Sequence, residues 1–83
     1  MQFLLMCRSL TYAQRSVKIL GKAGIAASVI RAPKSISTRG CGYCAVVPAR
    51  HAVRAMKILT DSGMRPETVY RREADGSIGE AAL

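Results

Sequence analysis

The stretch AQRSVKILGKAGIAASVIR (13–31) recurs in altered form as AVRAMKILTDSGMRPETVYR (52–71). Both stretches contain the run Lys-Ile-Leu, and in both a glycine follows four residues after that leucine, at Gly24 and at Gly63. Apolar residues recur at helical spacing before each glycine, and an apolar run follows it. Glycine at this place favours the left-handed conformation that ends many helices. The chain therefore contains two similar halves, each with a helix, a glycine stop and a strand.

Extended apolar stretches precede both helices, as QFLLMC (2–7) and YCAVV (43–47). The resulting order, β-α-β-β-α-β, predicts an α+β fold of the ferredoxin-like type, with a four-stranded antiparallel sheet and two helices on one face. In this plan the first and third strands are neighbours at the centre of the sheet. We predict one domain over residues 1–72, and a mobile tail over 73–83, where the periodicity is lost.

The first strand is apolar on both of its sides: Phe3, Leu5 and Cys7 alternate with Leu4 and Met6. Helices cover only one face of the predicted sheet. The other face is therefore expected to be uncovered and apolar, as a homodimer interface or a partner-docking surface.

Positive charge is concentrated in the first part of the chain. The net charge is +8, and all five acids fall between Asp61 and Glu80. A basic body of this kind attracts anions, which include nucleic acid, phosphorylated small molecules, an acidic partner or a thiolate within the domain. Six cations also recur at helical spacing, on the sides of the helices opposite their apolar faces. They form either solvated helix faces or a docking surface for an acidic partner. These residues are Arg15, Lys18, Lys22, Arg50, Arg54 and Lys57.

The three cysteines have no secretory signal before them, since Arg8 interrupts a short apolar run at the start of the chain. No apolar run reaches the length of a membrane span. We therefore expect a cytoplasmic protein with reduced thiols, in which clustered cysteines indicate chemistry or metal binding more often than structural disulfides.

Two of the cysteines lie in RGCGYC (39–44). The ferredoxin-like plan brings the end of strand one, the start of helix one, the loop before Cys41 and the start of strand three to one sheet edge. His51 is expected at the opposite edge. Cationic side chains and a helix N-terminus lower the pKa of a thiol and so favour its reactive form.

Cys41, with a glycine on each side, is the candidate nucleophile or carrier thiol. Cys44 is a candidate resolving thiol, although it pairs poorly with Cys41 if the two point to opposite sheet faces. Cys7 is a candidate companion thiol on the neighbouring strand. The residues expected to stabilise a thiolate here are Arg8, Lys34, Arg39 and Gly42.

Three other interpretations stay open at this point. The small residues can simply pack at a strand start. A metal site needs more ligands than one CxxC motif supplies, so it requires all three cysteines or a dimer, and no metal is expected. RNA-recognition domains carry a related motif on strand three, matched by Arg39, Gly40, Gly42 and Tyr43, but Cys41 and Val46 replace its aromatic residues, so nucleic acid is not expected.

These features together resemble the "putative selenium/sulfur carrier protein-like" family over about residues 3–71. The matching segments are the opening strand FLLMC, a helix closing in ILGKAGI, the run VIRAPKSIS, the pair Cys41-Gly42, and KILTDSGM before ETVY. The resemblance implies a small cytosolic carrier of activated sulfur or selenium, held as a persulfide or selenosulfide on Cys41.

The implied partners of the protein are a donor protein and an acceptor protein, and no cofactor is expected. The protein is expected to act as a shuttle more than as an enzyme. The sequence departs from the family pattern at Cys44, where an apolar or small residue is expected. The alternative function is a binding module without covalent chemistry, which binds RNA or protein through the basic surface and the open sheet face.

Overall fold

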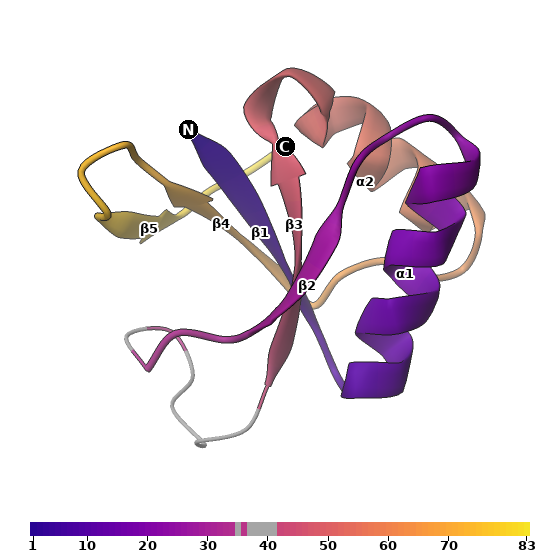
Figure 1. Cartoon of the computed structure of the whole chain (residues 1–83), viewed down its shortest axis with the longest axis horizontal. Helices are drawn as coiled ribbons and strands as arrows, with labels where there is room; N and C mark the ends of the chain where they lie inside the picture. The colour runs from indigo at the N-terminus through magenta and orange to yellow at the C-terminus, as the bar shows by residue number, and fades with distance from the viewer. Residues whose placement is uncertain (35, 37–41) are drawn as a thin grey trace.

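The computed structural model describes residues 1–34, 36 and 42–83. Within them, two helices pack against a five-stranded antiparallel sheet (Figure 1). The strands are β1 (Gln2–Cys7), β2 (Ser28–Arg31), β3 (Tyr43–Pro48), β4 (Thr68–Arg72) and β5 (Ile78–Glu80). The helices are α1 (Leu10–Lys22) and α2 (Ala52–Asp61), and the 3-10 turn η1 (Ala49–His51) precedes α2. The fold is therefore α+β, as the sequence predicts.

The strand order is β2-β3-β1-β4-β5, so β1 and β3 are antiparallel neighbours near the centre of the sheet, as predicted. The predicted number of four strands is wrong, because the described residues form five. The additional strand, β5, lies within residues 73–83, which were expected to be a mobile tail, and it pairs with β4. The sequence does not reveal it because β5 has only three residues, of which only Ile78 is a large apolar residue.

Both ends of α1 follow the local sequence. Ser9 is the N-cap, and its side chain accepts a hydrogen bond of 3.1 Å from the Tyr12 amide. After the helix, Gly24 has φ of +83°, and Gly63 takes φ of +74° after α2. The predicted glycine stops are therefore confirmed, because both backbones occupy the left-handed region that other residues rarely adopt.

Gly24→Ala is expected to lower the free energy of unfolding by about 1 kcal/mol, since a Cβ there meets no atom and only the backbone conformation resists it. Gly21→Ala is the matched control, because Gly21 lies inside α1 and its added Cβ is equally unobstructed. That variant is expected to raise stability by about 0.5–1 kcal/mol. Urea unfolding measures both, and equal effects would contradict the assignment of Gly24 as a conformational stop.

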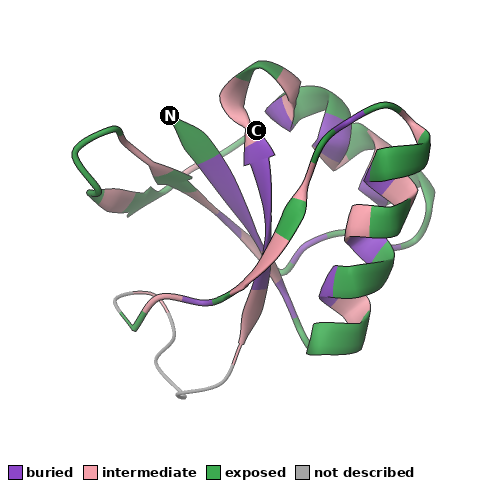
Figure 2. Ribbon diagram, in the orientation of Figure 1, coloured by how far each residue is buried: buried purple, intermediate pink, exposed green. Residues whose placement is uncertain are grey.

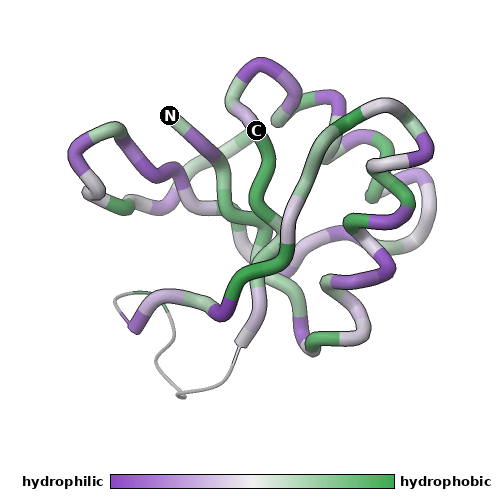
Figure 3. The backbone as a smooth tube through the Cα atoms, viewed as in Figure 1, coloured by the Kyte–Doolittle hydropathy of each residue, from purple (hydrophilic) through white to green (hydrophobic). Residues whose placement is uncertain are grey.

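The main core lies between the helices and one face of the sheet (Figure 2). Phe3 and Leu5 of β1 pack there with Leu20 of α1 and Leu59 of α2. The central strands β1 and β3 are largely hydrophobic, whereas hydrophilic residues recur along the helices (Figure 3). Within the described residues, neither helix is long or apolar enough to pass through a lipid bilayer.

A second, smaller core lies on the sheet face away from the helices. Leu4, Cys44 and Val46 are at most 5% exposed there, and Ala32, just after β2, is buried with them. Partly buried side chains complete this core, namely Met6, Ile30, Ile36, Tyr70 and Ile78. The predicted apolar character of this face is confirmed, but the prediction that it is uncovered is wrong at its centre. Of the two apolar β1 residues on this face, Leu4 is buried by the chain itself, whereas Met6 is only partly buried.

Candidate functional site

The predicted sheet edge is present in the described residues. Cys7, at the end of β1, lies opposite Tyr43 at the start of β3, and Arg31, at the end of β2, lies opposite the same tyrosine. Ser9, the N-cap of α1, follows Cys7 by two residues. Strand ends and a helix start therefore meet here, and we call this region the cysteine edge.

Two of the predicted site residues, Cys41 and Arg39, lie outside the described residues. Gly42, the residue after Cys41, is described, and its carbonyl accepts a hydrogen bond of 2.9 Å from the Ala32 amide. This bond continues the pairing of β2 with β3 beyond Arg31. Gly42 is thus held at the cysteine edge by the backbone.

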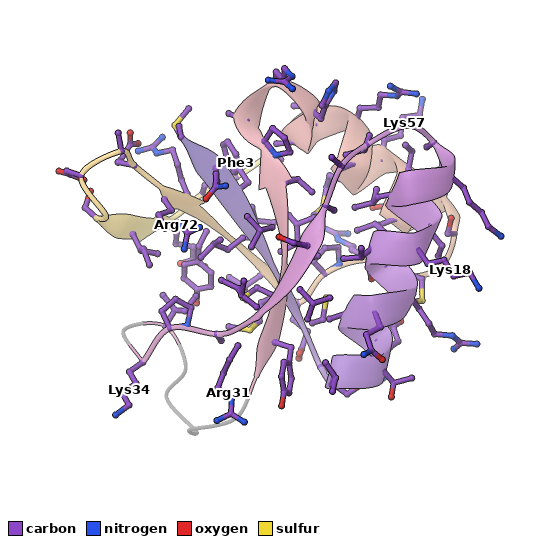
Figure 4. The ribbon with its side chains drawn as sticks, in the orientation of Figure 1. Phe3, Lys18, Arg31, Lys34, Lys57 and Arg72 are labelled. Atoms are coloured by element: carbon purple, nitrogen blue, oxygen red, sulfur yellow. The ribbon has the colours of Figure 1, made fainter. Side chains whose placement is uncertain are left out.

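Cationic side chains surround the cysteine edge. The Arg8 guanidinium lies 4.8 Å from the centre of the Tyr12 ring, and that of Arg31 lies 5.9 Å from the centre of the Tyr43 ring. Lys34 is exposed, and Figure 4 shows Arg31 and Lys34 in the same region, near the start of β3. Stacking on an aromatic ring favours a defined position of a guanidinium. Arg8, Arg31 and Lys34 therefore bring positive charge to this edge, and Glu67, whose amide donates to the Met6 carbonyl, brings one negative charge near Cys7.

Sequence reasoning did not identify the two tyrosines as partners of these arginines. Arg8 and Tyr12 are four residues apart, which is the spacing of neighbours on one helix face, so this contact could have been predicted from the sequence. Arg31 and Tyr43 are distant in sequence, and only the register of β2 with β3 brings them together.

Cys7 is a buried thiol, with 3% of its surface exposed, and it lies on the same side of β1 as Phe3 and Leu5. Its Sγ lies 3.4 Å from the Leu5 carbonyl oxygen, to which the thiol donates. Burial raises the pKa of Cys7, and hydrogen bonding with Ser16 offsets part of that rise. Its thiolate form is therefore disfavoured.

Cys44 is fully buried in the second core, on the opposite sheet face from Cys7. Its Sγ lies 4.0 Å from Met6 Sδ, and burial raises the pKa of Cys44 to about 11. Cys7 and Cys44 therefore point away from each other, in a geometry unsuited to a disulfide. The predicted roles of resolving and companion thiol both require an accessible sulfur, which neither residue has here.

The raised pKa of Cys44 predicts a loss of stability at alkaline pH. Since its folded pKa of about 11 exceeds the reference value of 9.0, its stabilising contribution is complete below pH 9 and is lost as the pH rises toward 11. We expect urea unfolding of the wild type to lose about 2 kcal/mol more over this range than unfolding of Cys44→Ala. Parallel pH profiles for the two proteins would contradict a buried neutral thiol.

The described residues hold no group of three or more His, Cys, Asp or Glu side chains placed to bind a metal ion. His51 lies after β3, at the end where Pro48 pairs with Gln2, and so at the edge opposite Cys7, as predicted. Its Nε2 accepts a hydrogen bond of 3.4 Å from Arg50 Nε.

The RNA-recognition interpretation needs an aromatic side chain on the sheet face away from the helices. Tyr43 alternates with Cys44 along β3 and so shares a side with Ala45 and Val47, which pack in the core beneath the helices. On the opposite face, Leu4, Cys44 and Val46 are buried and not aromatic, and the aromatic residue described there, Tyr70 of β4, is partly buried against them. The strand motif therefore does not build a base-stacking platform from these residues.

The fold and the cysteine edge define a small α+β domain with cationic side chains near the start of β3. A comparison with models of protein families matches residues 2–71 to the family described as putative Se/S carrier protein-like, and the chain belongs to this family. The resemblance inferred from the sequence is thereby confirmed. Comparisons with curated proteins and with solved structures gave no match.

Proposed function

We propose that this protein carries one sulfur or selenium atom on Cys41, as a persulfide or selenosulfide, between a donor protein and an acceptor protein. Family membership supports the carrier function. The observation that supports Cys41 as the carrier residue is the burial of the other two thiols, since Cys7 is 3% exposed and Cys44 is 0% exposed. A carrier thiol must reach another protein, so Cys41 is the cysteine suited to the task.

The transfer is a thiolate exchange. The Cys41 thiolate attacks the outer sulfur of a persulfide on the donor, a new S–S bond forms on Cys41, and the donor's S–S bond breaks to release its thiolate. The sulfane atom keeps its oxidation state, so no oxidant or reductant is needed. An acceptor thiolate then removes the outer atom from Cys41 by the same exchange.

The cysteine edge favours this chemistry through its charge. Arg8 and Lys34, together with Arg39, stabilise the Cys41 thiolate and then the anionic adduct. Gly42 lets a partner backbone approach closely, since it has no side chain. The order β2-β3-β1-β4 is that of the ferredoxin-like plan, to which β5 adds a strand, and in this plan the edge lies at the start of α1.

Intact mass spectrometry tests the proposal. Anaerobic incubation with a cysteine desulfurase and cysteine is expected to add one sulfur atom to the protein, and a thiol reductant is expected to remove it. Peptide mapping after alkylation should place the added atom on Cys41. A wild-type protein that gains no sulfur under these conditions would overturn the carrier function.

A further inference from the structure

The outer surface of the two helices carries a concentrated positive charge. Six of the thirteen cations of the chain are exposed there, three from α1 and three from η1 and α2. We call these residues the basic helix face: Arg15, Lys18, Lys22, Arg50, Arg54 and Lys57. Within each group the spacing is three or four residues, which places neighbouring cations on one side of the helix.

None of these six cations forms an ion pair within the described residues. The one ion pair in the described parts of the chain joins Arg71 to Glu73, after the second helix has ended. The only acid on either helix is Asp61, the last residue of α2. Like charges at helical spacing repel and destabilise a helix. A surface of this kind gains stability when another molecule supplies the opposite charge.

The two groups of cations lie on helices that are antiparallel neighbours. The Tyr12 hydroxyl, near the start of α1, donates to the Gly63 carbonyl after α2, at 3.2 Å. Arg54, near the start of α2, donates through Nη2 to the Ala23 carbonyl after α1, at 3.0 Å. In Figure 4 Lys18 and Lys57, from different helices, both lie on the helix side of the molecule.

The basic helix face runs along the helices, from Arg15 on the side of the cysteine edge to Lys22 and Arg50 at the opposite edge. Helix α1 begins at Leu10, directly after the N-cap Ser9 and the edge residue Arg8. Its 13 residues make it about 20 Å long. A protein lying along α1 therefore extends over the edge at which Gly42 enters β3.

We propose that the basic helix face docks an acidic surface of the protein that delivers the sulfane atom, and so holds the donor's persulfide at the cysteine edge. This inference rests on the carrier function proposed above. Charge complementarity supports a protein partner, since electrostatic attraction steers and orients protein association. The six residues of the face include no aromatic ring, whereas single-stranded nucleic acid is bound largely by stacking on such rings.

The experiment compares two sulfur donors of different size. The protein donor is a cysteine desulfurase charged with cysteine, and the small donor is glutathione persulfide, which needs no docking surface. The variant Lys18→Glu/Lys57→Glu reverses two charges on the basic helix face. The variant Arg65→Glu/Arg71→Glu reverses two exposed charges elsewhere and changes the net charge equally. Circular dichroism checks folding, and Lys18→Gln/Lys57→Gln replaces the first variant if it does not fold.

Loading of the first variant by the protein donor is expected to be about tenfold slower than loading of the wild type at low salt, with the difference shrinking at high salt. The control variant and all loading by glutathione persulfide should match the wild type. Equal loading of all variants by the protein donor would overturn the docking surface while leaving the carrier function intact. If neither donor loads the wild type, the carrier function itself fails, and this inference with it. A duplex nucleic acid that binds the wild type but not the first variant, with loading unchanged, would assign the face to nucleic acid instead.

Discussion

Replacing Cys41 with serine is expected to abolish sulfur uptake from protein and small-molecule donors alike. Serine keeps the size and polarity of the position but cannot form the persulfide on which the proposed transfer depends. Intact mass after incubation with glutathione persulfide measures the effect directly, because this donor needs no partner surface.

Cys44→Ala is the matched control for that substitution. Cys44 is fully buried in the second core, and burial raises its pKa to about 11, so its removal is expected to leave uptake at the wild-type level. The substitution is expected to lower the stability of the fold instead, because a packed sulfur atom is lost from the core. If Cys41→Ser still took up sulfur and Cys44→Ala did not, Cys44 would be the carrier thiol and the proposal would be contradicted.

Leu5→Ala is expected to have the largest effect on stability. Leu5 is 0% exposed, and its neighbours in register across the sheet are Ala45 of β3 and Val69 of β4. Truncating a leucine in such a core costs about 2–5 kcal/mol through lost burial and the cavity left behind. A domain of 83 residues has a total stability of about 4–12 kcal/mol, so one substitution removes a large part of it.

Val53→Ala provides the comparison for Leu5→Ala. Val53 lies on α2 with 67% of its surface exposed, so its truncation is expected to change the free energy of unfolding by less than about 0.5 kcal/mol. Urea unfolding followed by circular dichroism measures both variants. A cost below about 1 kcal/mol for Leu5→Ala would contradict the central position of β1 in the core.

The repeat in the sequence carries most of the information about the fold. Apolar spacing predicts both helices, and Gly24 and Gly63 mark their ends with positive φ. The central pairing of β1 with β3 follows from the order of the elements alone. These features depend on local patterns or on chain topology, which a single sequence displays.

The second core could not be predicted in the same way. It needs β5, which is only three residues long, to bring Ile78 against Tyr70 and the neighbouring strands. It also needs Ala32 and Ile36, which follow β2 and belong to no strand. Packing of this kind depends on how the chain turns after a strand, which hydrophobic periodicity does not encode. The apolar residues of β1 on this face were therefore predicted to be uncovered.

The candidate site, too, could be predicted from the sequence only in part. Topology predicts that Cys7, Arg8 and the start of β3 meet at one edge, and the register of β1 with β3 confirms this. The spacing of Cys41 and Cys44 indicates a pair of cysteines, yet Cys44 belongs to the core, which a CxxC spacing does not reveal. Alternation along a strand places successive side chains on opposite faces, so spacing alone does not distinguish a buried thiol from an accessible one.

The alkylation rate of each cysteine against pH tests the central claim most directly, with peptide mass spectrometry to separate the three sites. We predict that Cys41 in the native protein reacts with a midpoint below the ordinary thiol pKa of about 8.5. Cys7 and Cys44 should react at least about tenfold more slowly until the protein is unfolded, because burial raises the pKa of both. A midpoint for Cys41 at or above 8.5, or equal rates for the three cysteines, would contradict an activated carrier thiol at this position.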